Sequence, residues 1–370
     1  MRRCKNCLMP LTKPGLVLDE EGICQACNYS KIKKSINYEK RLEELKTFCE
    51  KYKRNDGYYD CIVTVSGGKD SHYQVYVLKK ICGMNPLLIS VEDYYSKTKA
   101  GIHNLKNIQE TFNCDLISLK INPSLGRKMS RIAFENFGSP NWLIDRAIYS
   151  FPIKMAINMK IPLIIYGENI SAEYGGFQSE ETYSAKEQIN NNVVKKVDWN
   201  LWHEKGITNK ELNMFKYPSQ QEIEKASLEP IYLSYFVPWS GFRNYQIAQK
   251  YGFHNINNEW KREGYVDCYD QVDSVGYLLH GWMKYPKFGF ARVTDTVGWW
   301  IRDGKITKEQ AIKLIKENDS LLDQKILDDF LNFTGYTIEE FWEIVEKFWN
   351  REIFEKIGGS WRLKPEHELS

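Results

Sequence analysis

The chain carries almost no excess of charge of either sign. Its 370 residues include 51 lysines and arginines against 48 aspartates and glutamates, so the formal net charge is only +3. A sequence-wide basic field that would draw the protein to nucleic acid or to an anionic membrane surface is therefore absent. We expect neither nucleic acid nor a membrane as a partner.

Long apolar runs and a secretory leader are also missing. No run approaches the roughly 18 apolar residues of a membrane-spanning helix. The first ten residues, MRRCKNCLMP, are charged but lack the apolar stretch of a signal peptide. We therefore expect a cytoplasmic protein.

The cysteines are not arranged for disulfides. Nine cysteines, an odd number, do not suggest a secreted disulfide framework in a chain of this length. Four of them form two CxxC pairs near the start, Cys4 with Cys7 and Cys24 with Cys27. Each pair can point two thiolates at one ion, so the spacing predicts a structural Zn²⁺ site. A segment this short rarely folds without a metal or disulfides.

Between residues 58 and 168, apolar strands alternate with helical segments. The predicted strands are YYDCIVTV (58–65), PLLISVE (86–92), CDLISLKI (114–121) and IPLIIYGE (161–168). The predicted helices span 70–82, 99–113 and 124–159. Strands that are apolar on both faces and separated by helices predict an α/β fold with a Rossmann-like parallel sheet. A ligand should lie at the carboxyl ends of its strands.

The composition changes beyond about residue 198. Tryptophan and tyrosine become frequent, and helical periodicity dominates from 308 to 354 without a further clear strand. We therefore expect three units. They are a Cys4 zinc module (1–30), an α/β domain (31–225) and a helical, aromatic-rich region for substrate or partner contacts (226–370).

The stretch SGGKDS (66–71) directly follows the first predicted strand. Gly67 and Gly68 let the backbone approach an anion closely, and the start of the next helix adds unpaired N–H groups. Neither the Walker A pattern nor the G-x-G-x-x-G of dinucleotide-binding folds is present. The stretch therefore predicts a different phosphate-binding loop, which we expect on the surface at the edge of the sheet.

SGG-x-DS after a first strand resembles the signature of the PP-loop ATP pyrophosphatases (adenine nucleotide alpha hydrolase-like fold). These enzymes cleave ATP between its α and β phosphates and transfer AMP to a carbonyl oxygen. GENISAE (167–173) is similar to the second ATP-site segment of amidating members. Together with the CxxC start and the late segment KFGFARVTD…IRDGKIT (287–307), the whole chain resembles the N-acetyl sugar amidotransferases. That family makes bacterial surface glycans, including pseudaminic and legionaminic acid derivatives of flagellin and O-antigen lipopolysaccharide sugars.

The resemblance implies a set of site residues. Lys69, Asp70 and Glu173 would be catalytic, and Asp70 and Glu173 would hold a Mg²⁺ ion that neutralises charge on the phosphates. Arg292 and Asp295 in the late segment would contact the substrate. The implied ATP-binding residues are Ser66, Gly67, Gly68, Lys69, Asp70, Ser71, Val91, Gly167, Glu168 and Asn169.

The implied reaction converts an acetamido sugar to an acetamidino sugar. An acetamido carbonyl is a poor electrophile, and transfer of AMP to its oxygen creates a leaving group that ammonia can displace. The chain begins Met1-Arg2, and no cysteine lies in a Gly-x-Cys-x-Gly elbow, so no built-in glutaminase is recognisable. We therefore expect ammonia from a separate glutaminase subunit, with a cyclase-like channel subunit as an optional further partner. The substrate would be an N-acetylated sugar, free or nucleotide-linked.

Two other functions remain open at this stage. PP-loop enzymes that thiolate RNA also combine SGG-x-DS with CxxC modules, but they need a basic track and sulfur-carrying cysteines beside the loop, and neither is evident. A binding module without catalysis would not need Lys69, Asp70 and Glu173 together. His72, next to the loop, could touch phosphate or face solvent on its helix, and the sequence does not separate these roles.

Overall fold

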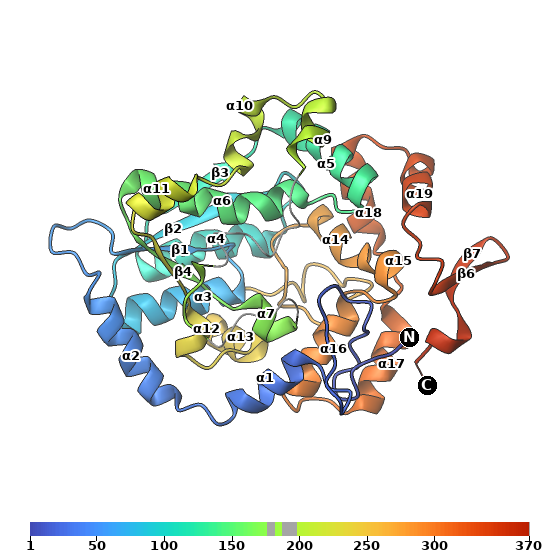
Figure 1. Cartoon of the computed structure of the whole chain (residues 1–370), viewed down its shortest axis with the longest axis horizontal. Coiled ribbons are helices and arrows are strands. Elements are labelled where there is room, and N and C mark those ends of the chain that lie inside the picture. The colour runs from blue at the N-terminus through green and yellow to red at the C-terminus, as the bar shows by residue number, and fades with distance from the viewer. Residues whose placement is uncertain (176–181, 187–197, 370) are drawn as a thin grey trace.

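The computed structural model describes residues 1–175, 182–186 and 198–369. Its centre is a five-stranded sheet in the order β3-β2-β1-β4-β5, in which every neighbouring pair is parallel (Figure 1). The strands are β1 (Cys61–Thr64), β2 (Pro86–Glu92), β3 (Leu116–Lys120), β4 (Leu163–Tyr166) and β5 (Glu229–Tyr232). The predicted α/β class and four strands are confirmed. The expectation of no clear strand beyond residue 198 is wrong, because the four-residue β5 completes the sheet from within that stretch.

Successive residues of each strand face opposite cores. In β1, Cys61 and Val63 point into the core shared with α2, α3 and α4, whereas Ile62 packs on the α6 side. Burial on both faces explains why the strand is an uninterrupted apolar run. The helices around the sheet are α2 (Tyr38–Glu50), α3 (Lys69–Tyr76), which continues as a π-helical turn (Val77–Ile81), α4 (Lys99–Phe112), α5 (Pro123–Phe137), α6 (Trp142–Met159), α7 (Ile170–Tyr174), α9 (Trp199–Glu204), α10 (Asn209–Leu212), α11 (Gln220–Lys225), α12 (Leu233–Phe236) and α13 (Gly241–Lys250).

The segment 124–159 is not one helix, as its periodicity suggested, but the two helices α5 and α6. Gly138 ends α5 with a left-handed backbone (φ 57°), where a residue with a side chain would be strained. Pro140 follows two residues later, and such a proline disfavours the helical conformation of the residue before it.

The C-terminal region is largely helical, as expected, but it also contains β5, a stretch without helix or strand from 251 to 275, and one hairpin. Aromatic side chains form its core: the rings of Phe134 and Phe341 stack with centroids 5.5 Å apart, and Phe330 lies edge-on to Phe134 at 5.1 Å. The elements are α14 (Leu279–Trp282), α15 (Lys284–Phe288), α16 (Arg292–Arg302), α17 (Lys308–Asn318), α18 (Gln324–Thr334), α19 (Ile338–Glu346) and the antiparallel pair β6 (Phe354–Ile357) and β7 (Ser360–Leu363).

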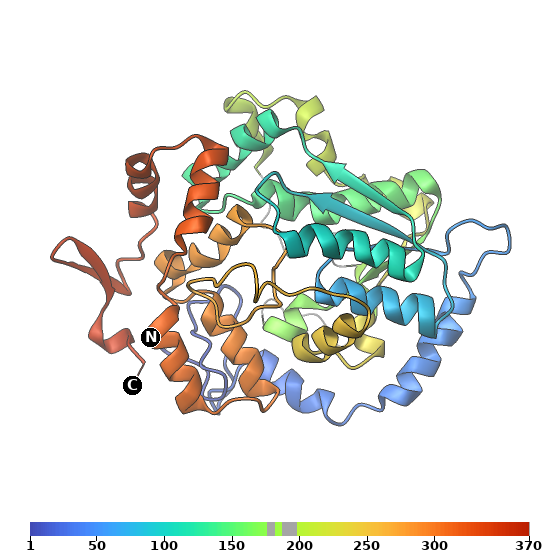
Figure 2. The same cartoon turned by 180° about the vertical axis from the view of Figure 1, so that it is seen from behind.

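The Cys4 module lies against the C-terminal helices and not at a distance from them (Figures 1 and 2). Leu8 packs with Val293 and Val297 of α16, and a Cβ on Gly298 would lie 3.5 Å from the carbonyl oxygen of Cys7. The module's helix α1 (Gln25–Lys33) then leads the chain to the sheet. The two ends of the molecule's sequence thus share one core. The domain limits at 30 and 225 stay predictions.

Among the described residues, no helix combines the length and the apolar character that crossing a membrane would need.

Candidate active site

The two segments expected to bind ATP meet at the carboxyl edge of the sheet. Residues 66–71 follow β1, and 167–169 follow β4, which pairs with β1. The sheet continues from β1 to β2 and β3 on one side and from β4 to β5 on the other, so its strand order reverses between β1 and β4. Ligands of open α/β sheets bind at such a switch point. The topology therefore brings both segments to one ligand site.

The loop after β1 is shaped by a glycine and two serines. Gly67 has a φ of 89°, and a Cβ there would lie 3.0 Å from the backbone nitrogen of Leu105 in α4, so only glycine fits. The Ser66 amide donates to Ser71 Oγ at 3.0 Å, and the Gly68 amide donates to Ser66 Oγ at 3.2 Å. These bonds fold the loop over the start of α3, where the helix dipole favours an anion.

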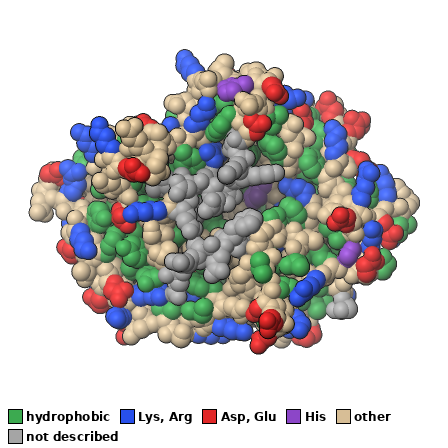
Figure 3. Space-filling model, viewed as in Figure 1, with side chains coloured by type: hydrophobic (Ala, Val, Ile, Leu, Met, Phe, Trp, Pro, Cys, Tyr) green, Lys and Arg blue, Asp and Glu red, His purple; other side chains and the backbone are tan. Residues whose placement is uncertain are grey.

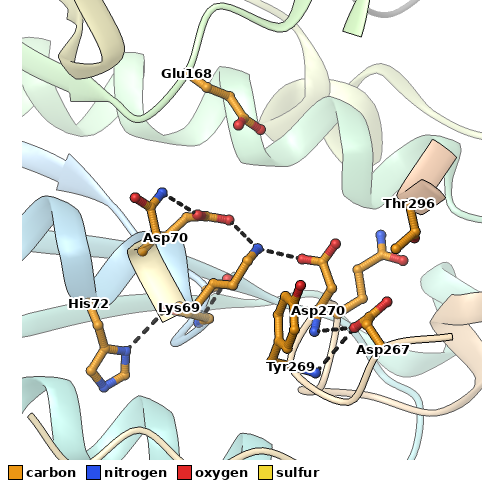
Figure 4. Close-up of polar contacts among 12 residues, drawn as sticks. Lys69, Asp70, His72, Glu168, Asp267, Tyr269, Asp270 and Thr296 are labelled. Atoms are coloured by element: carbon orange, nitrogen blue, oxygen red, sulfur yellow. Dashed lines mark hydrogen bonds and ion pairs between the residues drawn. The ribbon is translucent and has the colours of Figure 1, made fainter. Parts of the chain in front are cut away.

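Lys69 is buried in an ion-pair network, in contrast to the surface position that we expected for the loop. Its Nζ lies 2.7 Å from Asp70 Oδ2 and 2.6 Å from Asp270 Oδ1 (Figure 4). Burial opposes the charge of Lys69, but attraction to Asp270 and Asp70 outweighs it and raises the pKa. Asn244 of α13 donates to Asp70 Oδ1 at 2.7 Å. The expectation was wrong because β1 is central in the sheet and the C-terminal region covers its loop.

The segment 262–273, which holds Asp270, was not found from the sequence. Arg262 donates to the carbonyl oxygens of Asp270 (2.9 Å) and Asp267 (3.0 Å), and the Asp267 carboxylate accepts the Asp270 amide at 2.8 Å. Asp270 also pairs with Arg292. Burial alone would raise the pKa of Asp270, but Lys69 and Arg292 together lower it. The spacing of three aspartates in DCYDQVDS was the available signal, but it has no helical or strand period that would mark a site.

This acidic segment is held from behind by α4. A methyl group on Gly101 of α4 would collide with the carbonyl oxygen of Asp273. Thr98 at the start of the same helix donates through its hydroxyl to the Val272 carbonyl oxygen. The backbone of the segment therefore touches the backbone of α4 directly.

Two glutamates follow β4 and differ in their partners. Glu168 accepts hydrogen bonds from Tyr174 Oη (2.6 Å) and Trp239 Nε1 (2.9 Å), and burial and the nearby Asp70 raise its pKa to about 7. Glu173 forms an ion pair with Lys33 of α1 at 2.8 Å. Burial raises the pKa of Glu173 although Lys33 acts in the opposite direction.

Three adjoining cavities open at this edge of the sheet. A cavity of about 290 Å³ lies over the strand ends, where Gln74 Oε1 and Tyr166 Oη are buried without a hydrogen-bond partner among the described residues. A larger one, about 600 Å³, lies between the loop and the C-terminal region. Ser66, Asp70, Val91 and Glu168 line both. A third cavity of about 50 Å³ is lined by five carboxylates (Asp70, Glu168, Glu173, Asp270 and Asp303) and by the cations Lys33, Lys69 and Arg302.

Arg292 and Asp295 of α16 both line the larger cavity, where the resemblance implied substrate contacts. Arg292 pairs with Asp270, and Asp295 pairs with Lys284. His72 is buried, with Nδ1 3.0 Å from the Gly68 carbonyl oxygen, and burial lowers its pKa to about 4. The alternative that His72 faces solvent is therefore wrong, and its ring contacts the backbone of the loop at Gly68.

The four cysteine thiols of the N-terminal module converge in a buried cluster. Their sulfur atoms all lie within 4.8 Å of one another, with Cys4 3.8 Å from Cys27 and Cys7 3.6 Å from Cys24. The Cys24 amide and the Asn6 side chain point at sulfur atoms of the cluster at 3.3 and 3.2 Å. Four thiolates this close can bind one tetrahedral Zn²⁺ ion placed between them, with Zn–S bonds of about 2.3 Å.

The site and the sheet together define an α/β protein with a glycine-containing loop after β1, a largely helical C-terminal region and a candidate metal centre. Residues 229–366 match the family described as "LPS biosynthesis protein WbpG-like, C-terminal domain". The match begins at β5 and includes Asp270, Arg292 and Asp295, which line the larger cavity. The C-terminal part of the chain is thus similar to a lipopolysaccharide-biosynthesis domain.

Similar proteins cover only parts of the chain. An uncharacterized protein of Methanocaldococcus jannaschii is 32% identical over 119 residues, which are 32% of this chain and 42% of that protein. The chain therefore spans less than half the length of this relative.

Three solved structures resemble the fold loosely. They are an NH3-dependent NAD synthetase from Campylobacter jejuni (18% identity, 39% of this chain and 62% of that one, TM-score 0.31), an NMN synthetase from Francisella tularensis (13%, 52% and 92%, 0.30) and the U34-tRNA thiolase NcsA from Methanococcus maripaludis with its [4Fe-4S] cluster (14%, 69% and 74%, 0.27). All three TM-scores are below 0.5, so the fold is assigned from the sheet itself.

Proposed function

We propose that this protein is an ATP-dependent amidotransferase that converts the acetamido group of an N-acetyl sugar to an acetamidino group for a bacterial surface glycan. The observation that carries the proposal is the junction of the two large cavities at Ser66, Asp70, Val91 and Glu168. One cavity has the strand-end position of a nucleotide site, and the other is walled by the segment similar to a lipopolysaccharide-biosynthesis domain.

The loop and its lysine would serve the first step. ATP would place its adenosine over the strand ends, in the cavity that Gln74 and Tyr166 line, and its phosphates at the start of α3. The acetamido oxygen would attack the α phosphorus, so that an O–P bond forms and the bond to the β-phosphate oxygen breaks. Lys69 and the loop amides would stabilise the departing pyrophosphate.

Ammonia would complete the reaction. It would attack the activated carbon, the C–O bond to AMP would break, and the sugar oxygen would leave with AMP. A proton must leave the nitrogen in this step, and Glu168 is suited to accept it because its pKa of about 7 lies near the working pH.

Two metals fit the residues present. The Cys4 cluster would hold Zn²⁺ in a closed, structural site. Asp70 and Glu173 supply the carboxylate oxygens that Mg²⁺ prefers, once Glu173 is released from Lys33. When bound, Mg²⁺ would neutralise charge on the phosphates.

None of the nine cysteines is among the residues that line the three cavities. An RNA-thiolating enzyme would need a sulfur-carrying thiol beside the loop, so this arrangement supports amidation over thiolation. On the face seen in Figure 3, lysines and arginines are interspersed with aspartates and glutamates and form no continuous basic track. RNA binding along a phosphate track is not favoured on this face.

The decisive experiment measures AMP release from ATP and Mg²⁺ by the purified chain, with ammonium and a panel of N-acetyl sugars and nucleotide sugars. We expect sugar-dependent AMP and a product lighter by about one dalton, since NH replaces O. We also expect turnover with ammonium to rise with pH, and no turnover with glutamine until a glutaminase subunit is added. RNA-dependent AMP would favour the thiolating alternative, and glutamine-driven turnover by the chain alone would contradict the need for a partner.

A further inference from the structure

Part of the lining of the larger cavity has no role in the proposed chemistry. Lys13 of the Cys4 module and Lys284 of α15 both line the cavity, together with the rings of Phe288 and Phe290. These residues come from the Cys4 module and from α15 and the residues that follow it, far in sequence from residues 66–71. We call the pair of ammonium groups the Lys13–Lys284 wall.

Lys13 is held in place by backbone contacts of its own loop. Its amide donates to the Pro10 carbonyl oxygen at 3.1 Å, and its Nζ donates to the carbonyl oxygen of Tyr174 in α7. The neighbouring Thr12 donates through its hydroxyl to the Phe288 carbonyl oxygen. The loop between the two cysteine pairs is therefore clamped on both sides of the cavity, and the lysine has a fixed position in its wall.

The wall holds more positive than negative charge. Asp295 is paired with Lys284, and no described carboxylate forms an ion pair with Lys13. Burial lowers the pKa of Lys13, and Lys284 lowers it further, while Asp295 acts in the opposite direction. A third lysine nearby, Lys287, donates to the Gly138 carbonyl oxygen, and burial and Lys284 lower its pKa to about 8. Crowded lysines that share one carboxylate are stabilised by an added anion.

We propose that the Lys13–Lys284 wall binds an anionic group, a carboxylate or a phosphate, of the molecule that occupies the larger cavity. The aromatic rings of Phe288 and Phe290 would lie beside the sugar ring, and the two ammonium groups would each contribute charge-assisted hydrogen bonds. The Cys4 module then has a second role, since it supplies one half of a substrate contact as well as a folded core.

This inference rests on the proposed function only in taking the cavity as the sugar site, and binding is measured without ATP. The probes are N-acetylglucosamine, which is neutral, N-acetylglucosamine 1-phosphate and N-acetylglucosaminuronate, titrated calorimetrically at low salt. We expect at least one anionic probe to bind about tenfold or more tightly than the neutral sugar, as loss of a partly desolvated charge contact costs at least that much. The better of the two anionic probes identifies the group recognised.

The variants are Lys13→Met and Lys284→Met, which keep the apolar stem and remove the charge. Each should abolish most of the preference for the anionic probe while the neutral sugar binds as before. The matched control is Lys5→Met, because Lys5 is exposed on the same module. Zinc content and thermal unfolding check that each variant is folded, and Lys284→Met tests the wall if Lys13→Met disturbs the module.

The inference is overturned if neither anionic probe binds better than the neutral sugar, or if the preference survives both lysine substitutions. These results differ from a failure of the proposed function. AMP formation with a neutral sugar and no anion preference would sink the wall alone, whereas anion preference without AMP formation from any sugar would sink the amidotransferase alone.

Discussion

The sheet side of the site and its C-terminal side reach the same cavities by different means. The sheet side consists of residues 66–71 and 167–169, which follow strand ends, and of Val91 near the end of β2. The C-terminal side consists of Asp270, Lys284, Arg292 and Asp295, joined by Lys13 from the start of the chain. Phosphate binding needs backbone amides at a helix start, which a short contiguous motif can supply. Substrate contacts need side chains from several directions, and these come from segments far apart in the sequence.

We expect the largest effect from a substitution that unfolds the Cys4 module, on which the C-terminal side rests, and leaves the sheet side intact. Cys24→Ser should reduce zinc from about one per chain to almost none, because folding of so small a module is coupled to metal binding. Hydrogen exchange in residues 1–30 should rise, and AMP formation should fall while ATP still binds. Cys268→Ser, outside the cluster, is the control. Full zinc content in Cys24→Ser would contradict the metal centre.

A smaller loss should follow from a change on the sheet side. Asp70→Asn keeps the shape of the side chain but removes its charge beside Lys69. We expect AMP formation to fall by about a hundredfold or more, near 3 kcal/mol in the transition state, with little change in thermal unfolding. Asp328→Asn, at an exposed position of α18, should leave the rate unchanged. A rate for Asp70→Asn close to that of the unchanged protein would show that the loop is not the catalytic site.

The two sides should prove to be coupled through Lys69 and Asp270. Removing one member of a buried ion pair leaves the other charge uncompensated, so Lys69→Met and Asp270→Asn should each destabilise the fold. The double variant should be less destabilised than the sum, by roughly 1 to 3 kcal/mol. Urea unfolding of the four proteins gives this coupling energy. Additive losses would mean that the two sides do not support each other.

The smallest expected effect is a pH dependence from Glu168. Its folded pKa of about 7 lies above the usual value of 4.5, so the folded state holds its proton more tightly than the unfolded state. The stability contributed by this group is present below pH 4.5 and is lost as the pH rises toward and through 7. Between pH 5 and pH 8, the free energy of unfolding of the unchanged protein should therefore fall by about 1 to 2 kcal/mol more than that of Glu168→Gln. Urea unfolding at pH 5 and pH 8 measures both falls, and an equal fall in the two proteins would contradict the raised pKa.

Sequence patterns predicted the elements whose signals are local. The strand at 61–64, the glycine loop and the four cysteines each depend on residues that are neighbours in the chain, and all appear where expected. The sites of ATP and magnesium binding remain predictions. Six of the ten residues predicted to bind ATP line the strand-end cavity, and Asp70 and Glu173 line the smallest one, whereas Gly67 and Asn169 line none of the three cavities.

The features that were missed depend on tertiary contacts. β5 has only four residues, too few for a period to stand out, and it becomes a strand because β4 offers it a free edge. Lys69 looked exposed because its loop is short and polar, and only the packing of 262–273 and α13 over it explains its burial. Asp270 lies in a segment without periodicity, so no pattern could connect it with a lysine some two hundred positions earlier.

Because Gly101 has no side chain, α4 approaches the backbone of Asp273, a residue that lines the larger cavity. Because α4 touches the carbonyl oxygen of Asp273 there, the position of the acidic segment is set by the thickness of one backbone. Replacement by alanine would push that segment toward the cavity and change the room left for a substrate without altering any lining residue. Position 101 would thus act as a spacer that sets the width of the cavity from outside the site.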